Sequence, residues 1–215
     1  MKFSKLSLVT VLAISTVSTT LIADSEVSIS SNVSATNNYV WRGMTQSANK
    51  VAVQGGMDAE YMGLYLGTWV SNVDFGSPAT AEIDGYFGYG GEVVGIEYDL
   101  GYIKYAYLNE GDANFEEAHF GLSKDFGVAS IGATYSMGID DAPDDIALEA
   151  SVGLIEDYSL ELGWGDYDTV GTRYSVALSK SFDKVDFSIG YHEFTHDTDN
   201  SSDEKNIVVS VSTGF

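Results

Sequence analysis

Hydrophobic residues in this chain alternate with small or polar residues, and this period of two constrains the fold more than any other feature. Residues 172–182 give the clearest case: one face carries Tyr174, Val176, Leu178 and Phe182, and the other carries Arg173, Ser175, Ala177, Ser179 and Ser181. Residues 185–192 and 206–215 repeat the pattern. No long window shows helical spacing. The sequence therefore predicts an all-β protein whose strands have one apolar and one polar face.

Composition removes several classes of function. The 215 residues include no cysteine and carry a formal net charge of −22. The absence of cysteine excludes a disulfide scaffold, thiol catalysis and a zinc ribbon. The negative charge opposes binding to a phosphate backbone, so we expect no nucleic-acid partner. With 44% hydrophobic and 13% aromatic residues, the chain is too apolar for a disordered acidic tail.

The first residues have the pattern of an export signal. Lys2 and Lys5 precede an apolar run at 6–22, which ends at the small residue Ala23. A basic region, an apolar region and a small residue predict a signal peptide over residues 1–23. An N-terminal membrane anchor is the alternative, which the serine and threonine content of the run disfavours. After residue 23 no window of about 18 residues is apolar enough to span a bilayer as a helix. We expect residues 24–215 to form one exported domain.

Three features favour a transmembrane barrel over a soluble β-sandwich. The polar faces are rich in glycine and serine, which suits the inside of a narrow barrel, and aromatic residues recur near strand ends. The last run has apolar residues at alternate positions up to Phe215 and resembles the terminal strand of bacterial outer-membrane barrels. The predicted fold is a transmembrane antiparallel up-and-down β-barrel. An exported soluble sandwich would instead come free without detergent.

The number of alternating runs predicts the size of the barrel. We read twelve runs, near 27–41, 51–61, 64–73, 82–90, 95–107, 115–124, 128–137, 146–155, 158–166, 172–182, 185–194 and 206–215. The 192 residues after the signal give 16 for each strand and its connection, and a membrane strand needs about 9–11 of them. The run at 64–73 has apolar residues on both faces, so the sequence does not say which of its residues point inward.

The expected connections alternate in length. Tight turns lie at 61–63, 90–94, 125–127, 156–157 and 183–184, and longer loops at 42–50, 74–81, 108–114, 138–145, 167–171 and 195–205. Short periplasmic turns and longer extracellular loops are typical of outer-membrane barrels. The pattern therefore predicts location in the outer membrane.

The N-terminal half also resembles a known family. The matching residues are Tyr39-Val40-Trp41-Arg42-Gly43, Thr45-Gln46-Ser47, Gln54-Gly55-Gly56, Asp58, Gly63, Tyr65, Gly67-Thr68-Trp69, Ser71-Asn72-Val73-Asp74-Phe75, Glu82, Asp84, Tyr86, Gly88 and Tyr98-Asp99-Leu100-Gly101-Tyr102. Over residues 31–123 they are similar to the TorF-type porin family of small proteobacterial outer-membrane proteins. The resemblance implies a porin, without catalytic residues and without a named substrate.

If the apolar faces contact lipid, the opposite faces line the bore. The acidic candidates are Asp58, Glu60, Glu82, Asp84, Glu97, Asp99, Glu117, Glu149, Glu161 and Asp186; the other candidates are Arg42, Arg173, His119 and His192. A change of phase near Tyr102 would add Lys104. Ten acids against Arg42, Arg173 and Lys104 leave a charge of about −7, which predicts cation preference. Arg42 is the expected strut between the first strand and facing acids.

The loops suggest contact with ions and lipid but no dedicated site. Residues 197–203 begin like a calcium loop, yet Ser202 stands where that loop needs glycine. We expect no cofactor and no specific metal, only diffuse Mg²⁺ or Ca²⁺ that bridges acidic loops to lipopolysaccharide. The other expected partners are outer-membrane lipid, the barrel-assembly machinery through the strand ending at Phe215, and small solutes or cations. We expect a monomer.

The sequence favours a narrow, water-filled diffusion channel for small solutes, because twelve strands lie between filled eight-strand barrels and open sixteen-strand ones. A plugged structural or adhesion barrel that acts through its acidic loops is the alternative. A barrel enzyme with a loop-borne site is less favoured. Its histidines would be His119, His192 or His196, and no serine has a recognisable nucleophile context.

Overall fold

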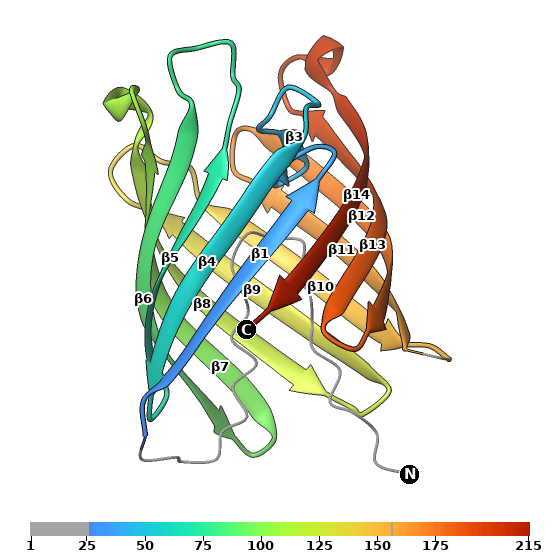
Figure 1. Cartoon of the computed structure of the whole chain (residues 1–215). Helices are drawn as coiled ribbons and strands as arrows, with labels where there is room; N and C mark the ends of the chain where they lie inside the picture. The colour runs from blue at the N-terminus through green and yellow to red at the C-terminus, as the bar shows by residue number, and fades with distance from the viewer. Residues whose placement is uncertain (1–25, 156) are drawn as a thin grey trace.

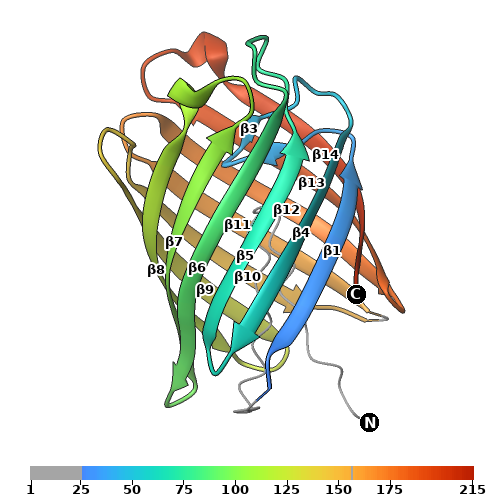
Figure 2. The ribbon, with the colours of Figure 1, turned by 60° about the vertical axis from the view of Figure 1, so that its left-hand side comes forward.

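The structure, a computed structural model, describes residues 26–155 and 157–215, so the expected signal peptide lies outside the described residues. Twelve antiparallel strands close into a barrel in which each strand pairs with its neighbours in sequence and the first pairs with the last (Figures 1 and 2). The barrel strands are β1 (Ser28–Thr36), β4 (Ala52–Tyr61), β5 (Leu64–Asn72), β6 (Ala81–Val93), β7 (Ile96–Tyr107), β8 (Phe115–Asp125), β9 (Ala129–Gly138), β10 (Asp145–Gly153), β11 (Tyr158–Tyr167), β12 (Gly171–Phe182), β13 (Val185–His196) and β14 (Glu204–Gly214). This confirms the predicted twelve-strand barrel.

The connections differ in length at the two ends of the barrel (Figure 1). At the short-turn end, Met62-Gly63 and Val94-Gly95 have positive φ at both residues, as type I′ hairpin turns require. Val94-Gly95 replaces the longer turn expected at 90–94, because β6 extends to Val93. The long-loop end carries two short 3-10 helices, η1 (Gly111–Ala113) and η2 (Asn200–Ser202).

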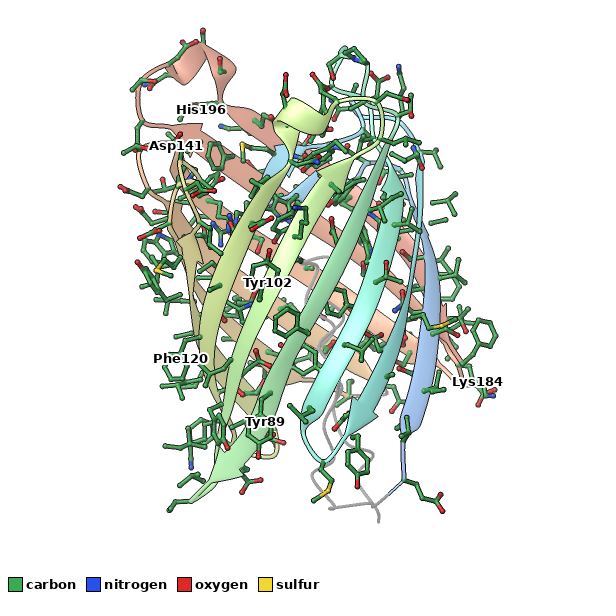
Figure 3. The ribbon with its side chains drawn as sticks, turned by 90° about the vertical axis from the view of Figure 1, so that its left-hand side faces the viewer. Tyr89, Tyr102, Phe120, Asp141, Lys184 and His196 are labelled. Carbon is green, nitrogen blue, oxygen red and sulfur yellow. The ribbon has the colours of Figure 1, made fainter. Side chains whose placement is uncertain are left out.

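Alternation along the strands separates an apolar outer face from a polar inner face. Leu178, Ile189 and Val209 are paired across three strands, and Ile189 is 52% exposed on the outside. The next row, Ser179, Ser188 and Ser210, faces inward. Figure 3 shows Tyr89, Tyr102 and Phe120 on the outer side, with His196 and Asp141 at the long-loop end and Lys184 at the opposite end. An apolar outer belt is what a barrel in lipid presents.

In the described part of the chain, no helix is both long enough and apolar enough to span a bilayer.

The first predicted strand, 27–41, is wrong in its second half. β1 ends at Thr36, and the chain then forms a separate two-stranded sheet of β2 (Val40–Trp41) and β3 (Met44–Thr45). The break lies at Asn37 and Asn38, whose side chains bond to the backbone of Ile207 and to Asn206 instead of continuing the strand. The predicted loop at 42–50 is therefore partly a hairpin.

The predicted change of phase near Tyr102 is also wrong, because the inward and outward residues of β7 alternate along its whole length. Ile103 and Tyr105 are buried on the inner face at 2% and 3% exposure. Lys104 lies on the outer face, where its Nζ is 2.6 Å from Glu116 Oε1. The apolar residues that suggested a phase change point inward because another segment packs against them inside the barrel.

Candidate functional site

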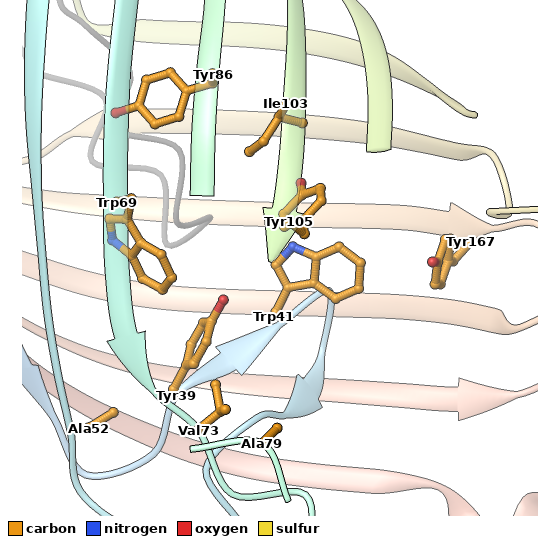
Figure 4. Packing of buried hydrophobic residues seen from close by; sticks show 10 residues of the cluster. All are labelled: Tyr39, Trp41, Ala52, Trp69, Val73, Ala79, Tyr86, Ile103, Tyr105 and Tyr167. Atoms are coloured by element: carbon orange, nitrogen blue, oxygen red, sulfur yellow. The ribbon is translucent and has the colours of Figure 1, made fainter. Parts of the chain in front are cut away.

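The segment inside the barrel is residues 38–45, here called the inner hairpin. Its two short strands are joined by Arg42 and Gly43, which have φ values of 48° and 85°. This turn also has positive φ at both positions, a conformation in which arginine is strained. The hairpin lies within the ring of strands near the long-loop end (Figures 1 and 4).

Aromatic side chains hold the inner hairpin against the barrel wall. The ring of Tyr39 lies 5.3 Å from that of Trp69, centroid to centroid. The ring of Trp41 lies 5.7 Å from Tyr105, 5.9 Å from Phe115 and 5.7 Å from Tyr167 (Figure 4). The bore therefore contains an apolar cluster at this level, where the wall of a water-filled channel would be polar.

Arg42 forms the strut that the sequence predicts, but from the hairpin tip instead of a strand. Its two terminal nitrogens donate to Glu117 at 2.6 and 2.8 Å, and its Nε lies 3.5 Å from Asp145. Its guanidinium carbon is 4.3 Å from the Trp41 ring and 4.7 Å from the Tyr167 ring. Burial alone would lower the pKa of Arg42, but Glu117, Tyr105 and Asp145 together outweigh burial and raise that pKa above its ordinary value.

Arg173 extends this ion pair into a network of four charges. It donates to both carboxylate oxygens of Asp145, at 2.5 and 2.8 Å. Its guanidinium lies over Gly165, where any side chain would collide with it. Two arginines and two carboxylates alternate, so the network is neutral while all four groups are ionised. The sequence pattern does not predict Asp145 as a site residue, because it places position 145 in a loop. Asp145 lies two residues before Ala147 and four before Glu149, and this continuation of the alternation is the signal that could have found it.

The far side of the inner hairpin contacts the end of the chain. Asn206 donates to the backbone oxygen of Gly43 at 3.3 Å, and the backbone nitrogen of Thr45 donates to Glu204 at 2.8 Å. Gly43 packs against Phe194. With the contacts above, the hairpin touches residues of β5, β7, β8, β10, β11, β13 and β14. It therefore reaches across the bore.

The strand register places the other predicted site residues on one face of the sheet. Glu97, Glu149 and His192 belong to a single inward row, and the rest pair with residues of neighbouring inward rows. On β5, Tyr65, Gly67, Trp69 and Ser71 point inward, which assigns the strand that the sequence left open. All the predicted residues except Arg42 thus lie on the inner wall: Asp58, Glu60, Glu82, Asp84, Glu97, Asp99, Glu117, His119, Glu149, Glu161, Arg173, Asp186 and His192. Whether they line a conducting path stays a prediction.

The inner face has a large excess of carboxylates. Asp145 joins the ten predicted acids, and Arg42 and Arg173 are the basic residues that face inward. Among the described residues no lysine faces inward, since Lys104, Lys124, Lys180 and Lys205 lie on outward rows and Lys50 and Lys184 lie in connections. Glu92, Asp125 and Glu204 also belong to inward rows, so fourteen acids and two arginines give a formal charge of −12.

The histidines do not come together. His119 lies 2.6 Å from Asp99, which also accepts from the Tyr65 hydroxyl at 3.0 Å. His192 is buried on β13, and the ring of His196 packs on Phe194. Within residues 26–155 and 157–215, no group of three or more His, Asp or Glu side chains is arranged to hold a metal ion.

Comparison with known families gives a direct match. Residues 21–203 match the Gcw_chp family, described as bacterial proteins of unknown function. The chain belongs to the Gcw_chp family. The TorF-type name remains a resemblance over the N-terminal half, and no curated protein matches the chain.

Solved structures with the same fold include porins and an enzyme. The KdgM porin has a TM-score of 0.61 at 10% identity, covering 87% of this chain and 98% of its own. The NanC porin has a TM-score of 0.58 at 10% identity, covering 86% and 99%. Outer membrane phospholipase A from Escherichia coli has a TM-score of 0.54 at 10% identity, covering 86% and 89%. At these identities the likeness shows a shared porin-like barrel fold and does not carry over an activity.

Proposed function

We propose that this protein is an outer-membrane channel for small cations, narrowed at its extracellular end by the inner hairpin. The observation that carries the proposal is the charge of −12 on the inner face. Export, outer-membrane location and a monomeric state belong to the same proposal, and the apolar outer belt supports the membrane location.

The distribution of the charges favours cations. Arg42 and Arg173 engage Glu117 and Asp145. Twelve other carboxylates share the inner face, and no lysine of the described residues faces them. Charges of one sign inside a wall of low dielectric constant focus the field and raise the local concentration of counter-ions. Rings of Asp and Glu select cations in other pores by the same principle.

The structurally similar KdgM porin has been solved in complex with oligogalacturonate, an acidic sugar polymer. An inner face with this excess of carboxylates would repel such a polyanion. We therefore propose that small cations and small neutral solutes pass, and that acidic oligosaccharides do not. The inner hairpin sets the upper limit on size.

The test is a pair of neutralising changes at inner-face acids that the arginines do not engage. Glu149→Gln with Glu161→Gln should move the reversal potential in a KCl gradient toward zero. Glu193→Gln is the matched control, because Glu193 lies on the outer face beside Lys205. An anion-selective reversal potential for the unmodified protein would overturn the proposal.

A closed barrel that acts through its loops is the second candidate, and the reach of the inner hairpin across the bore favours it. A folded barrel that never conducts, even after the hairpin is loosened, would support this second candidate. A barrel enzyme has less support, because His119, His192 and His196 stand apart.

A further inference from the structure

Two carboxylates are buried between the inner hairpin and β6, and no positively charged side chain pairs with them. Glu82 and Asp84 lie two residues apart on the inner face of β6, and each is 1% exposed. Glu82 Oε2 and Asp84 Oδ1 accept no hydrogen bond. The hydroxyl of Tyr39, on the hairpin, is also buried without a hydrogen-bond partner.

These unpaired oxygens belong to one place in the fold. Glu82 is paired in the sheet with Ser71 and Tyr107, and Asp84 with Trp69 and Tyr105. Tyr39 packs on Trp69, and the hydroxyls of Tyr39 and Tyr107 lie near the Glu82 carboxylate. The site is thus formed by one wall of the barrel and the side of the hairpin that faces it.

The arginines do not supply the missing positive charge. Arg42 is engaged by Glu117 and Asp145, and Arg173 by Asp145. Two buried carboxylates without a counter-charge are costly, so they must share protons or hold a cation.

We propose that Glu82 and Asp84 bind one divalent cation of the calcium type, with the hydroxyls of Tyr39 and Tyr107 as further oxygen donors. One such ion neutralises both carboxylates. Calcium takes 6–8 oxygen ligands in flexible geometry, from carboxylates that bind through one or both oxygens and from neutral donors. The two carboxylates and two hydroxyls offer six oxygens, and water can complete the shell.

The cation would tie the inner hairpin to β6, beside the Arg42 network, since Tyr105 is paired with Asp84 in the sheet and its hydroxyl donates to Glu117. This proposal goes beyond the channel proposal and does not depend on it, because a barrel that never conducts could still bind the ion.

Terbium luminescence tests the site, because Trp69 and Tyr39 beside it can sensitise a bound lanthanide. The refolded full-length barrel is stripped with a chelator and titrated with Tb³⁺, then with Ca²⁺ as competitor. We expect saturable emission that Ca²⁺ displaces. Glu82→Gln with Asp84→Asn should abolish it, while Glu149→Gln with Glu161→Gln, at other inner-face acids, should leave it unchanged. Circular dichroism verifies that each variant folds.

A milder variant keeps the test valid if the double variant misfolds. Tyr39→Phe preserves the packing on Trp69 but removes one donor, and it should weaken Tb³⁺ binding several-fold. The proposal is overturned if the unmodified barrel shows no saturable emission, or if the emission survives the double variant or is unchanged by Tyr39→Phe. An infrared band of protonated carboxylic acid that persists in Ca²⁺ and disappears in the double variant would also overturn it, because the pair would then share protons.

Discussion

Arg42 and Glu117 are 75 residues apart in the chain, and they meet inside the barrel through two parallel hydrogen bonds of 2.6 and 2.8 Å. One partner stands at the tip of the inner hairpin and the other on β8. Their bond fixes the hairpin in the bore, because the strained turn that carries Arg42 must be held by what its side chain binds.

Removing Arg42 should therefore cost more than removing a surface charge. Arg42→Ala leaves Glu117 buried without its arginine, while Asp145 keeps Arg173. Breaking a buried pair in this way costs about 3–5 kcal/mol. Urea unfolding in detergent should show a lower midpoint. Lys50→Ala is the control, since Lys50 pairs with Asp74 at the surface and its loss should change little. Equal midpoints for the two variants would contradict the role of Arg42.

A methyl group at Gly43 should displace the inner hairpin. Its φ is +85°, and an added Cβ would lie 3.1 Å from the Cβ of Phe194 and 3.2 Å from that of Arg173. We expect Gly43→Ala to cost about 1–2 kcal/mol from the backbone alone, with more from crowding. Gly76→Ala shares the positive φ but has open space around it, so it reports the backbone cost by itself. The difference between their unfolding free energies measures the crowding, and no difference would argue against the packed tip.

Trp41 should limit the width of the bore. Trp41→Ala removes three aromatic contacts and the partner beneath Arg42, which should lower stability by about 3–5 kcal/mol and enlarge the single-channel steps. Trp164→Ala is the matched change on the outer face, where Trp164 is paired with Tyr174. It should leave the steps unchanged. Equal step sizes in both variants would mean that the hairpin does not restrict the path.

The outer belt should be sensitive to charge only where it faces hydrocarbon. Ile189→Arg, in the middle of the outer face of β13, should lower the unfolding free energy by about 2–4 kcal/mol in a lipid bilayer. Val94→Arg places the same charge in a turn at the end of the barrel, where Val94 is 92% exposed, and should cost little. A barrel that tolerates Ile189→Arg would not have its outer face in lipid.

Local pattern was enough to predict much of this fold. Alternation predicted the twelve strands, the alternating connection lengths and the inward face of the acids, because each is a property of one strand or one turn. It failed at Val40 and Trp41, which lie in the inner hairpin, and at Lys104, whose neighbours Ile103 and Tyr105 point into the barrel. These departures from the rule mark the inner hairpin and the wall that it covers, which is where a functional site is expected to break the general pattern.

The pairings of the candidate site lay beyond the reach of sequence reasoning. The sequence does predict Arg42 as a strut, because it is a lone base on a segment that faces several acids. Its partners, Glu117 and Asp145, could not be predicted. They depend on how the barrel closes and on the turn at Arg42-Gly43, which reverses the chain inside the barrel. The unpaired state of Glu82 and Asp84 likewise depends on the hairpin that buries them.

The most direct test of the account is the single-channel conductance of the refolded protein in a planar bilayer with a KCl gradient, measured beside Trp41→Ala. The account predicts small steps with a cation-selective reversal potential, and larger steps of the same selectivity in the variant. Anion-selective steps, or a folded barrel that conducts in neither form, would contradict it.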